Sequence, residues 1–339
     1  MAEVNGTKRD VIVIGGSAGG LEALKALVAD LPANLPASMF VVIHISSDYP
    51  SIIPEILTRT GRLPAIHPKD GQPIEPGNIY VAPPDRHLLI KNGTVRVTRG
   101  PRENRHRPAI DPLFRSAARS YGPRVVGVVL SGQLDDGAAG ISAIKMRNGL
   151  TVVQDPRQAI APQMPWAALR TGQIECVLPV NGIAALLQSV SRQPARDGLH
   201  KETAMSGDID KEASKAELEN NTTPDNLGHP SVFTCPECHG TLWQVDENGM
   251  VTFRCRVGHA YSTEALSASL SESAEDALWA AMRVMQEKAD LLRRLAASQG
   301  EEMGQKLREE ARDYDTHMDA LRGILVEHQN HTPDNASEP

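Results

Sequence analysis

Short runs of β-branched residues alternate with helix-like segments between Asp10 and about Arg192, and this alternation limits the fold more than any other feature. Strands that alternate with helices are typical of a mostly parallel sheet covered by helices on both faces. The sequence therefore predicts a doubly wound α/β domain over residues 8–194. The expected strands are Asp10–Gly15, Met39–Ile45, Asn78–Pro83, Arg124–Leu130 and Leu150–Asp155, and the clearest helical stripes are Leu21–Leu31 and Ala138–Met146.

The sequence pattern predicts four further segments. The pair Asn92-Gly93 between two strand-like runs predicts an antiparallel hairpin within the α/β domain. Residues 195–230 are polar and charged, which predicts a flexible linker because they cannot bury enough apolar surface. A cysteine-bearing stretch predicts a small zinc-ribbon-like module over residues 231–264. Two stretches with helical periodicity, separated near Gly300, predict a helical tail over residues 265–328.

Charge and hydropathy exclude two classes of partner. The 339-residue chain has a formal net charge of −7, whereas general nucleic-acid binders present a basic face to phosphates. No apolar run reaches the roughly 20 residues of a membrane span, and the first ten residues contain no apolar segment of the signal-peptide kind. We therefore expect a cytoplasmic protein that neither binds nucleic acid nor inserts into a membrane.

The first expected strand runs directly into Gly15-Gly16-Ser17-Ala18-Gly19-Gly20 and then into a helix. This spacing fits a nucleophile turn, in which glycines permit the tight backbone that exposes a serine hydroxyl. It also fits a glycine turn that cradles a nucleotide phosphate, and the segment alone does not separate the two. A dinucleotide site would favour glycine where Ser17 stands and an acid at the end of the second strand.

The second strand ends instead in His44, and another strand is followed by Asp135 and Asp136. Carboxyl ends of parallel strands meet at one edge of a sheet, so these groups can approach Ser17. A lone histidine is more often structural, and an aspartate before a helix often caps it. Together, however, a hydroxyl, an imidazole and a carboxylate predict a hydrolase of the serine type that needs no cofactor for catalysis.

Five blocks in chain order resemble the catalytic domain of the bacterial chemotaxis protein-glutamate methylesterases, the CheB family. They are VIVIGGSAGGLEAL, VVIHIS, PGNIYVAPPDRHLLI, NRHRPAIDPLF and GVVLSGQLDDGAAGISAIK. The resemblance implies a catalytic triad of Ser17, His44 and Asp136, and it implies that the backbone N–H of Gln133 donates to the oxyanion. It also implies hydrolysis of glutamate γ-methyl esters on chemoreceptor-type proteins, in chemotaxis or a related signalling pathway, with deamidation of glutamines as a second activity.

The resemblance also implies how the domain meets its partners. Family members usually carry an N-terminal receiver domain, whereas this chain begins at the esterase domain, so we expect a separate receiver or methyltransferase protein to act with it. The cationic segment with Arg102, Arg105 and Arg107 is a candidate contact for an acidic, methylated receptor stem, although such runs are often only solvated surface. The alternative function is a catalytically silent signalling adaptor that recruits partners through its C-terminal module.

Four residues late in the chain have the spacing of a zinc site: Cys235, Cys238, Cys255 and His259. Three thiols and one imidazole suit tetrahedral Zn²⁺, and a site whose four ligands all come from protein is structural. The stretch between the two pairs predicts a hairpin that turns at residues 247–249. Metal-free buried thiols remain the alternative, and His239 is a competing ligand with poorer geometry. This module and tail resemble an extension found on some family members.

Overall fold

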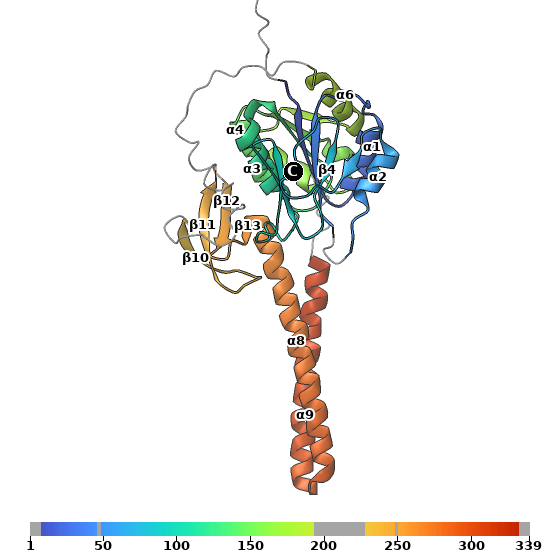
Figure 1. The fold of residues 1–339 in the computed structure, drawn as a ribbon. Helices are drawn as coiled ribbons and strands as arrows, with labels where there is room; N and C mark the ends of the chain where they lie inside the picture. The colour runs from blue at the N-terminus through green and yellow to red at the C-terminus, as the bar shows by residue number, and fades with distance from the viewer. Residues whose placement is uncertain (1–7, 46–48, 193–227, 248–249, 332–339) are drawn as a thin grey trace, which may run out of the picture. The chain divides into compact units, whose positions relative to one another are not determined.

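The computed structural model describes residues 8–45, 49–192, 228–247 and 250–331, and it divides into two compact units at residues 266 and 267. The predicted linker over 195–230 and the turn at residues 248–249 therefore lie largely outside the described residues. Figure 1 shows the elements of both units.

A fully parallel, seven-stranded sheet forms the centre of the first unit, with the strand order β3-β4-β2-β1-β7-β8-β9. The chain moves outward from β1 in one direction, returns, and continues on the other side of β1, which is the pattern of a doubly wound sheet. The strands are β1 (Val11–Gly16), β2 (Ser38–Ile43), β3 (Ala65–Ile66), β4 (Ile79–Val81), β7 (Val125–Val129), β8 (Leu150–Gln154) and β9 (Cys176–Leu178).

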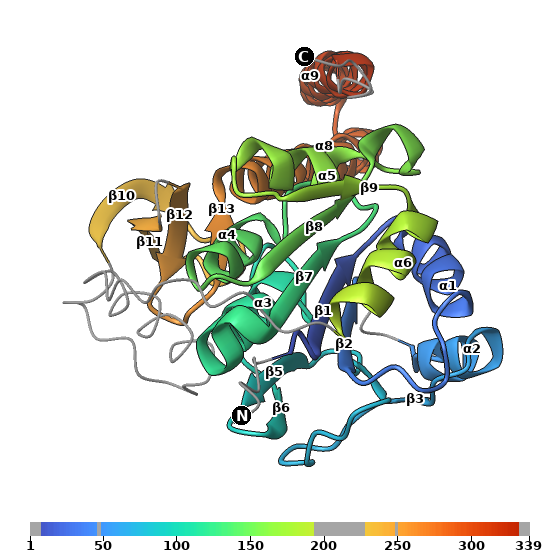
Figure 2. The same ribbon diagram turned by 90° about the horizontal axis from the view of Figure 1, so that it is seen from above.

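Helices cover both faces of this sheet, as Figure 2 shows. Helices α1 (Gly20–Ala29), α2 (Ile53–Thr60) and α6 (Val180–Val190) contribute to the apolar cluster on one face. The opposite cluster takes side chains from α3 (Ile110–Tyr121), α4 (Ala138–Met146) and α5 (Gln163–Arg170). Strand residues alternate between the two clusters, Ile12 and Ile14 on one face and Val11 and Val13 on the other, because successive side chains of a strand point to opposite faces. Two short 3₁₀ helices span Gly122–Arg124 and Pro156–Gln158.

An antiparallel hairpin of β5 (His87–Lys91) and β6 (Thr94–Thr98) packs on the α3 face. Its turn contains Asn92 and Gly93, both with positive φ, as a two-residue hairpin turn requires. The predicted hairpin is therefore confirmed, and so is the predicted α/β class with a mostly parallel sheet. Each of the five predicted strands is present, with bounds that differ by one or two residues at most ends.

A small antiparallel sheet, here called the cysteine module (residues 228–262), belongs to the same compact unit. Its strands are β10 (His229–Thr234), β11 (Thr241–Glu247), β12 (Met250–Cys255) and β13 (Ala260–Ser262). Strands β11 and β12 pair in antiparallel register, which confirms the predicted hairpin. Seven buried residues form the small core of the module and of the helix start that follows it: Cys235, Leu242, Phe253, Cys255, Tyr261, Ala265 and Leu266.

Two long helices, α8 (Thr263–Ser298) and α9 (Glu301–His331), supply the second unit from residue 267 onward. They pair through a narrow apolar seam in which Ala289 and Leu292 of α8 meet Ala311 of α9. An ion pair between Arg293 and Asp315 also joins them. The two helices cover the two stretches with helical periodicity. Within the described residues, no helix combines the length and apolar character needed to cross a membrane.

We expect the crossing of α3 and α4 to depend on Gly140. A Cβ at this position would lie 2.5 Å from the Phe114 Cβ and 3.0 Å from an Asp111 carboxylate oxygen. Gly140→Ala should therefore lower the free energy of unfolding by about 1–3 kcal/mol through overpacking. Urea unfolding followed by circular dichroism would measure this change. Gly323→Ala in α9 is the matched control, because nothing lies within 4 Å of its Cβ position, and equal stability of the two variants would contradict the expectation.

Candidate functional site

The carboxyl ends of β1, β2 and β7 bring the predicted site residues to one edge of the sheet. In the parallel register, Gly16 lies opposite Ile43, so the next residues, Ser17 and His44, leave adjacent strands at the same level. The His44 N–H donates to the Gly16 carbonyl over 3.0 Å. The Ser17 N–H donates to the carbonyl of Ser131, which follows β7, over 2.9 Å. The sheet itself therefore gathers these segments.

Glycines shape the turn around Ser17. Gly19 has a φ of 73° and precedes the first residue of α1, which is a conformation that glycine adopts without strain. Gly132 packs so closely on the turn that a Cβ there would lie 2.9 Å from the Ser17 Cβ. Ser17 remains half-buried and Ala18 is exposed. The hydroxyl thus stands on a constrained turn that solvent and a substrate can reach.

His44 and Asp136 form the central contact of the site. The His44 Nε2 lies 2.8 Å from Asp136 Oδ2, and the two side chains are only 5% and 2% exposed. An ionised carboxylate only accepts hydrogen bonds, so Nε2 carries the proton and Nδ1 of a neutral ring has the free lone pair. That Nδ1 is buried and has no hydrogen-bond partner among the described residues. It is therefore available to accept a proton.

The Asp136 carboxylate accepts four hydrogen bonds. The donors are His44 Nε2 at 2.8 Å, the Ile110 N–H at 2.7 Å, the Asp111 N–H at 3.2 Å and the Asn104 Nδ2 at 3.0 Å. Ile110 and Asp111 begin α3, where free N–H groups and the positive end of the helix dipole favour an anion. Burial opposes ionisation, but these hydrogen bonds and His44 hold the pKa of Asp136 below its usual range. The carboxylate stays charged.

Asp111 is the second buried carboxyl of this cluster, and its pKa shifts in the opposite direction from that of Asp136. Burial and the negative charge of Asp136 raise the pKa of Asp111 well above its ordinary value. Like charges in one buried site disfavour each other's ionisation, so Asp111 holds its proton more tightly than Asp136 does. Asp111 Oδ1 accepts the Gly140 N–H at 2.6 Å, which ties α3 to α4.

His106 stacks on the His44 ring, with the centroids 3.6 Å apart and an interplanar angle of 13°. Burial, and then the adjacent His44, lower the pKa of His106 to about 3. The ring is therefore neutral near pH 7 and covers one face of His44 without adding charge. His106 stands at the end of a two-residue turn that begins at Glu103.

The predicted oxyanion donor lies beside this cluster. Gln133 is exposed and follows Gly132, which packs against Ser17. Its backbone N–H has no acceptor within the described part of the chain, and neither does that of Ala18. Both groups are therefore available to donate to an anion near the hydroxyl.

The three predicted substrate-contact arginines differ in their surroundings. All three are half-buried rather than fully exposed. Arg107 donates from Nε to Asp85 Oδ1 over 2.7 Å and from Nη1 to the Gly100 carbonyl over 2.8 Å. These contacts give Arg107 a structural role in the loop. Arg102 and Arg105 precede His106 in the same loop.

The cysteine module gathers the four predicted metal ligands. The ligand atoms of Cys235, Cys238, Cys255 and His259 lie within 4.8 Å of one another. Cys238 Sγ and Cys255 Sγ are 3.6 Å apart, and Cys255 Sγ lies 3.5 Å from His259 Nδ1. Tetrahedral zinc with Zn–S bonds of about 2.3 Å separates its ligand atoms by about 3.5–3.8 Å. The residues therefore fit this ion, and His239 is not part of the cluster.

The other ring nitrogen of His259 supports the same interpretation. His259 Nε2 lies 3.3 Å from a carboxylate oxygen of Glu237. Metal-binding histidines commonly pair their second nitrogen with a carboxylate, which orients the ring and selects the tautomer that binds through the first.

Sequence reasoning missed three residues of the site: Asn104, His106 and Asp111. All three lie in NRHRPAIDPLF, a block with several polar side chains just before and inside the start of a helix. That concentration of polar residues was the available signal. It could not show that Asn104 and Asp111 are buried beside Asp136.

The chain is similar to proteins of one described family. Residues 12–187 match the family model described as CheB methylesterase. The crystal structure of the Thermotoga maritima CheB methylesterase catalytic domain is similar with a TM-score of 0.51 and 30% identity, over 54% of this chain and 98% of that one.

Curated relatives are also similar. A protein-glutamate methylesterase/protein-glutamine glutaminase of Anaeromyxobacter dehalogenans is 37% identical over 191 residues, which are 56% of this chain and 56% of that protein. One from Xanthomonas euvesicatoria is 37% identical over 187 residues, which are 54% and 52%. The chain thus spans about half the length of the curated relatives it matches.

His106 gives a pH-dependent stability that can be measured. Its folded-state pKa of about 3 lies below the ordinary value of about 6.5, so the unfolded chain binds a proton between these values that the folded chain does not. Its stabilising contribution is complete above about pH 6.5 and is lost as the pH falls toward 3, by up to about 1 kcal/mol per pH unit. His106→Phe keeps a ring over His44 and removes this titration. Urea unfolding between pH 4 and 8 should therefore show a shallower acid loss in the variant, and identical slopes would contradict the assignment.

Proposed function

The chain belongs to the CheB methylesterase family, and we propose that it hydrolyses glutamate γ-methyl esters on chemoreceptor-type proteins through Ser17, His44 and Asp136. The observation that carries this proposal is the 2.8 Å contact between His44 Nε2 and Asp136, which leaves Nδ1 buried and without a hydrogen-bond partner in the described part of the chain, just after β2 and next to the strand that leads to Ser17. That arrangement supplies a base whose tautomer is fixed by a carboxylate.

The reaction follows from these groups. His44 Nδ1 takes the Ser17 proton as the serine oxygen attacks the ester carbonyl, and Asp136 stabilises the imidazolium that forms. Collapse of the tetrahedral intermediate breaks the bond to the methoxy group, and His44 returns the proton so that methanol leaves. Water then attacks the acyl-enzyme by the same route, releasing the glutamate carboxylate and restoring Ser17. The same attack on a glutamine side chain releases ammonia, which matches the glutaminase named for the relatives.

The backbone N–H of Gln133 stabilises the oxyanion in this scheme. Its lack of another acceptor among the described residues leaves it free for an anion that forms only during the reaction. The N–H of Ala18, at the start of the turn into α1, is a second donor of the same kind.

In this proposal, positively charged side chains in the loop beside the site recognise the substrate. Arg102 and Arg105 precede His106 in the same loop, and positive charge there would attract an acidic receptor stem and hold its ester near Ser17. Methylated chemoreceptors or similar signalling proteins are the substrates in this proposal, within a chemotaxis-like pathway. A separate receiver or methyltransferase protein is the proposed partner in control. The intact His44–Asp136 contact favours this enzyme over a silent adaptor.

We also propose that Cys235, Cys238, Cys255 and His259 hold one structural Zn²⁺. The support is the close approach of the four ligand atoms and the Glu237 carboxylate behind His259. A core of seven buried residues is too small to fold this module alone, so metal–ligand bonds supply the missing free energy.

Replacing Ser17 with alanine should abolish methanol release and leave the fold intact, because the hydroxyl serves only chemistry. Asp136→Asn should lower kcat by about 10²–10⁴, less than loss of the nucleophile, and should also destabilise the fold. An amide nitrogen cannot accept the hydrogen bonds that converge on Asp136. The assay measures methanol released from methylated receptor fragments. Ser191→Ala, which removes a buried hydroxyl at the end of α6, is the control, and wild-type turnover by Ser17→Ala would refute the nucleophile assignment.

The purified chain should contain one zinc ion per molecule by elemental analysis. Cys235→Ser should remove most of this metal, because a hydroxyl replaces a buried thiolate ligand. Cys176→Ser is the control, since Cys176 lies in β9 of the parallel sheet and outside the cluster. Equal zinc in the Cys235→Ser variant and the wild type would reject the site.

A further inference from the structure

Asn104 is buried next to the Asp136 carboxylate and belongs to no helix or strand. It is 6% exposed and lies in the turn between Glu103 and His106, where both central residues have positive φ. Asparagine tolerates this conformation better than most residues. The turn thus holds a side-chain amide inside the polar cluster of the site.

The amide of Asn104 makes a contact at each end. Its Nδ2 donates to Asp136 Oδ1 over 3.0 Å and to Asp111 Oδ2 over 2.9 Å. Its Oδ1 accepts the backbone N–H of Ser262 over 2.9 Å. A backbone N–H can only donate, so this bond requires the amide oxygen to face Ser262 and the NH₂ group to face the carboxylates. Rotation of the amide would place oxygen against the Asp136 charge.

Ser262 is the last residue of β13, the edge strand of the cysteine module, and several contacts hold that strand on the loop. The Asn104 N–H donates to the Ala260 carbonyl over 2.8 Å. The Ser262 hydroxyl donates to Asp135 Oδ1 over 2.7 Å and accepts the Ala265 N–H, which caps the start of α8. The cysteine module therefore contacts the same loop that reaches Asp136.

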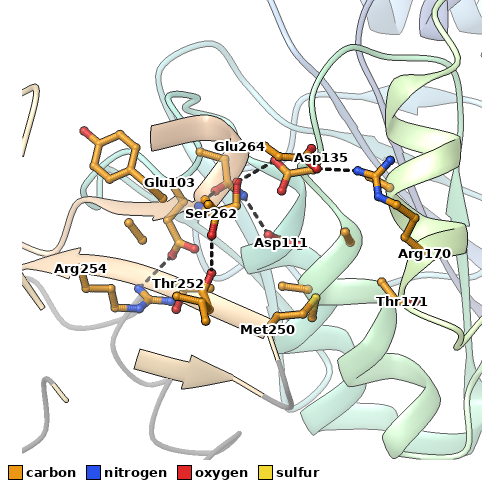
Figure 3. Close-up of a pocket in the computed structure, with 18 of the residues that line it drawn as sticks. Glu103, Asp111, Asp135, Arg170, Thr171, Met250, Thr252, Arg254, Ser262 and Glu264 are labelled. Carbon is orange, nitrogen blue, oxygen red and sulfur yellow. Dashed lines mark hydrogen bonds and ion pairs between the residues drawn. The ribbon is translucent and has the colours of Figure 1, made fainter. Parts of the chain in front are cut away.

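A buried ion cluster anchors this contact. Glu103 accepts from Arg115 of α3 over 2.5 Å and lies 3.8 Å from Arg254 of β12. All three side chains are 6% exposed or less. They line a cavity of about 250 Å³ within the first unit, and Figure 3 shows Glu103 facing Arg254, with Ser262 and Asp135 close by. Breaking a buried charge pair is costly, so Glu103 holds the loop to Arg254 of β12.

We propose that Asn104 is a positioning residue for Asp136 and that strand β13 of the cysteine module sets its orientation. The cysteine module is then a working part of the esterase site, although it contributes no group that touches substrate. This inference rests on the proposed function for its effect on turnover. Its structural part, the order of the His44–Asp136 contact, can be measured without turnover.

Removing the Ser262 N–H tests the proposal. Ser262→Pro deletes that donor on an edge strand, where proline is tolerated, and also removes the Ser262 hydroxyl. Ser262→Ala is therefore the control for the hydroxyl, and Thr263→Pro is the control for a proline at the first position of α8. Asn104→Gly removes the amide and keeps the positive φ. We expect Ser262→Pro and Asn104→Gly to lower kcat by about tenfold to a hundredfold with KM little changed, because a misplaced base slows chemistry and Asn104 is buried away from substrate.

Two readouts on the full-length protein decide the matter: methanol release from methylated receptor fragments, and the downfield proton resonance of the His44–Asp136 hydrogen bond. The resonance should shift or broaden in Ser262→Pro and Asn104→Gly but remain as in wild type in Thr263→Pro. Unchanged kcat and resonance in Asn104→Gly would overturn the proposal, as would equal behaviour of the two proline variants. If Ser262→Pro loses its zinc, Asn104→Gly decides alone. Absence of methanol release by the wild type would refute the proposed function, while the resonance would still test the coupling.

Discussion

The buried carboxylate of Asp136 is the constraint on which the rest of the site depends. An ionised group that is 2% exposed is costly unless donors replace the water it has lost. Two backbone N–H groups at the start of α3, the Asn104 amide and His44 provide that replacement. The four donors come from three parts of the fold, so the position of the carboxylate requires α3, the 101–109 loop and the end of β2 to be in place together.

The neighbouring acids show how the protein limits negative charge there. Asp111 lies beside Asp136 and has a raised pKa, whereas the pKa of Asp136 is lowered, so Asp136 ionises before Asp111. Glu103, at the other side of the loop, is paired with Arg115 and Arg254. The Asp136 anion is directed at His44. Such an anion orients an imidazole and stabilises its protonated form.

The contacts between β13 and the loop that carries Asn104 give the cysteine module a second role. By itself it is a small sheet with few buried residues, and its four clustered ligand atoms would fit a metal ion. Its edge strand, however, packs within the same compact unit as the α/β domain and reaches the loop that carries Asn104. From Ser262, three successive hydrogen bonds lead through Asn104 and Asp136 to the His44 imidazole.

The strands, the antiparallel hairpin, the positions of Ser17, His44 and Asp136 at one sheet edge, and the Cys₃His spacing could all be predicted from local sequence. Hydrophobic periodicity determines the strands, and parallel pairing brings their carboxyl ends together whatever the details of packing. Asn104, Asp111 and the stacked His106 could not be found in this way. Their roles depend on contacts between distant segments, such as the bond from Ser262 to Asn104, which joins residues 158 positions apart. Local sequence determines which groups a strand end presents, whereas only the packed tertiary structure determines which distant amide or ring meets them, because burial and hydrogen-bond geometry arise from the whole fold.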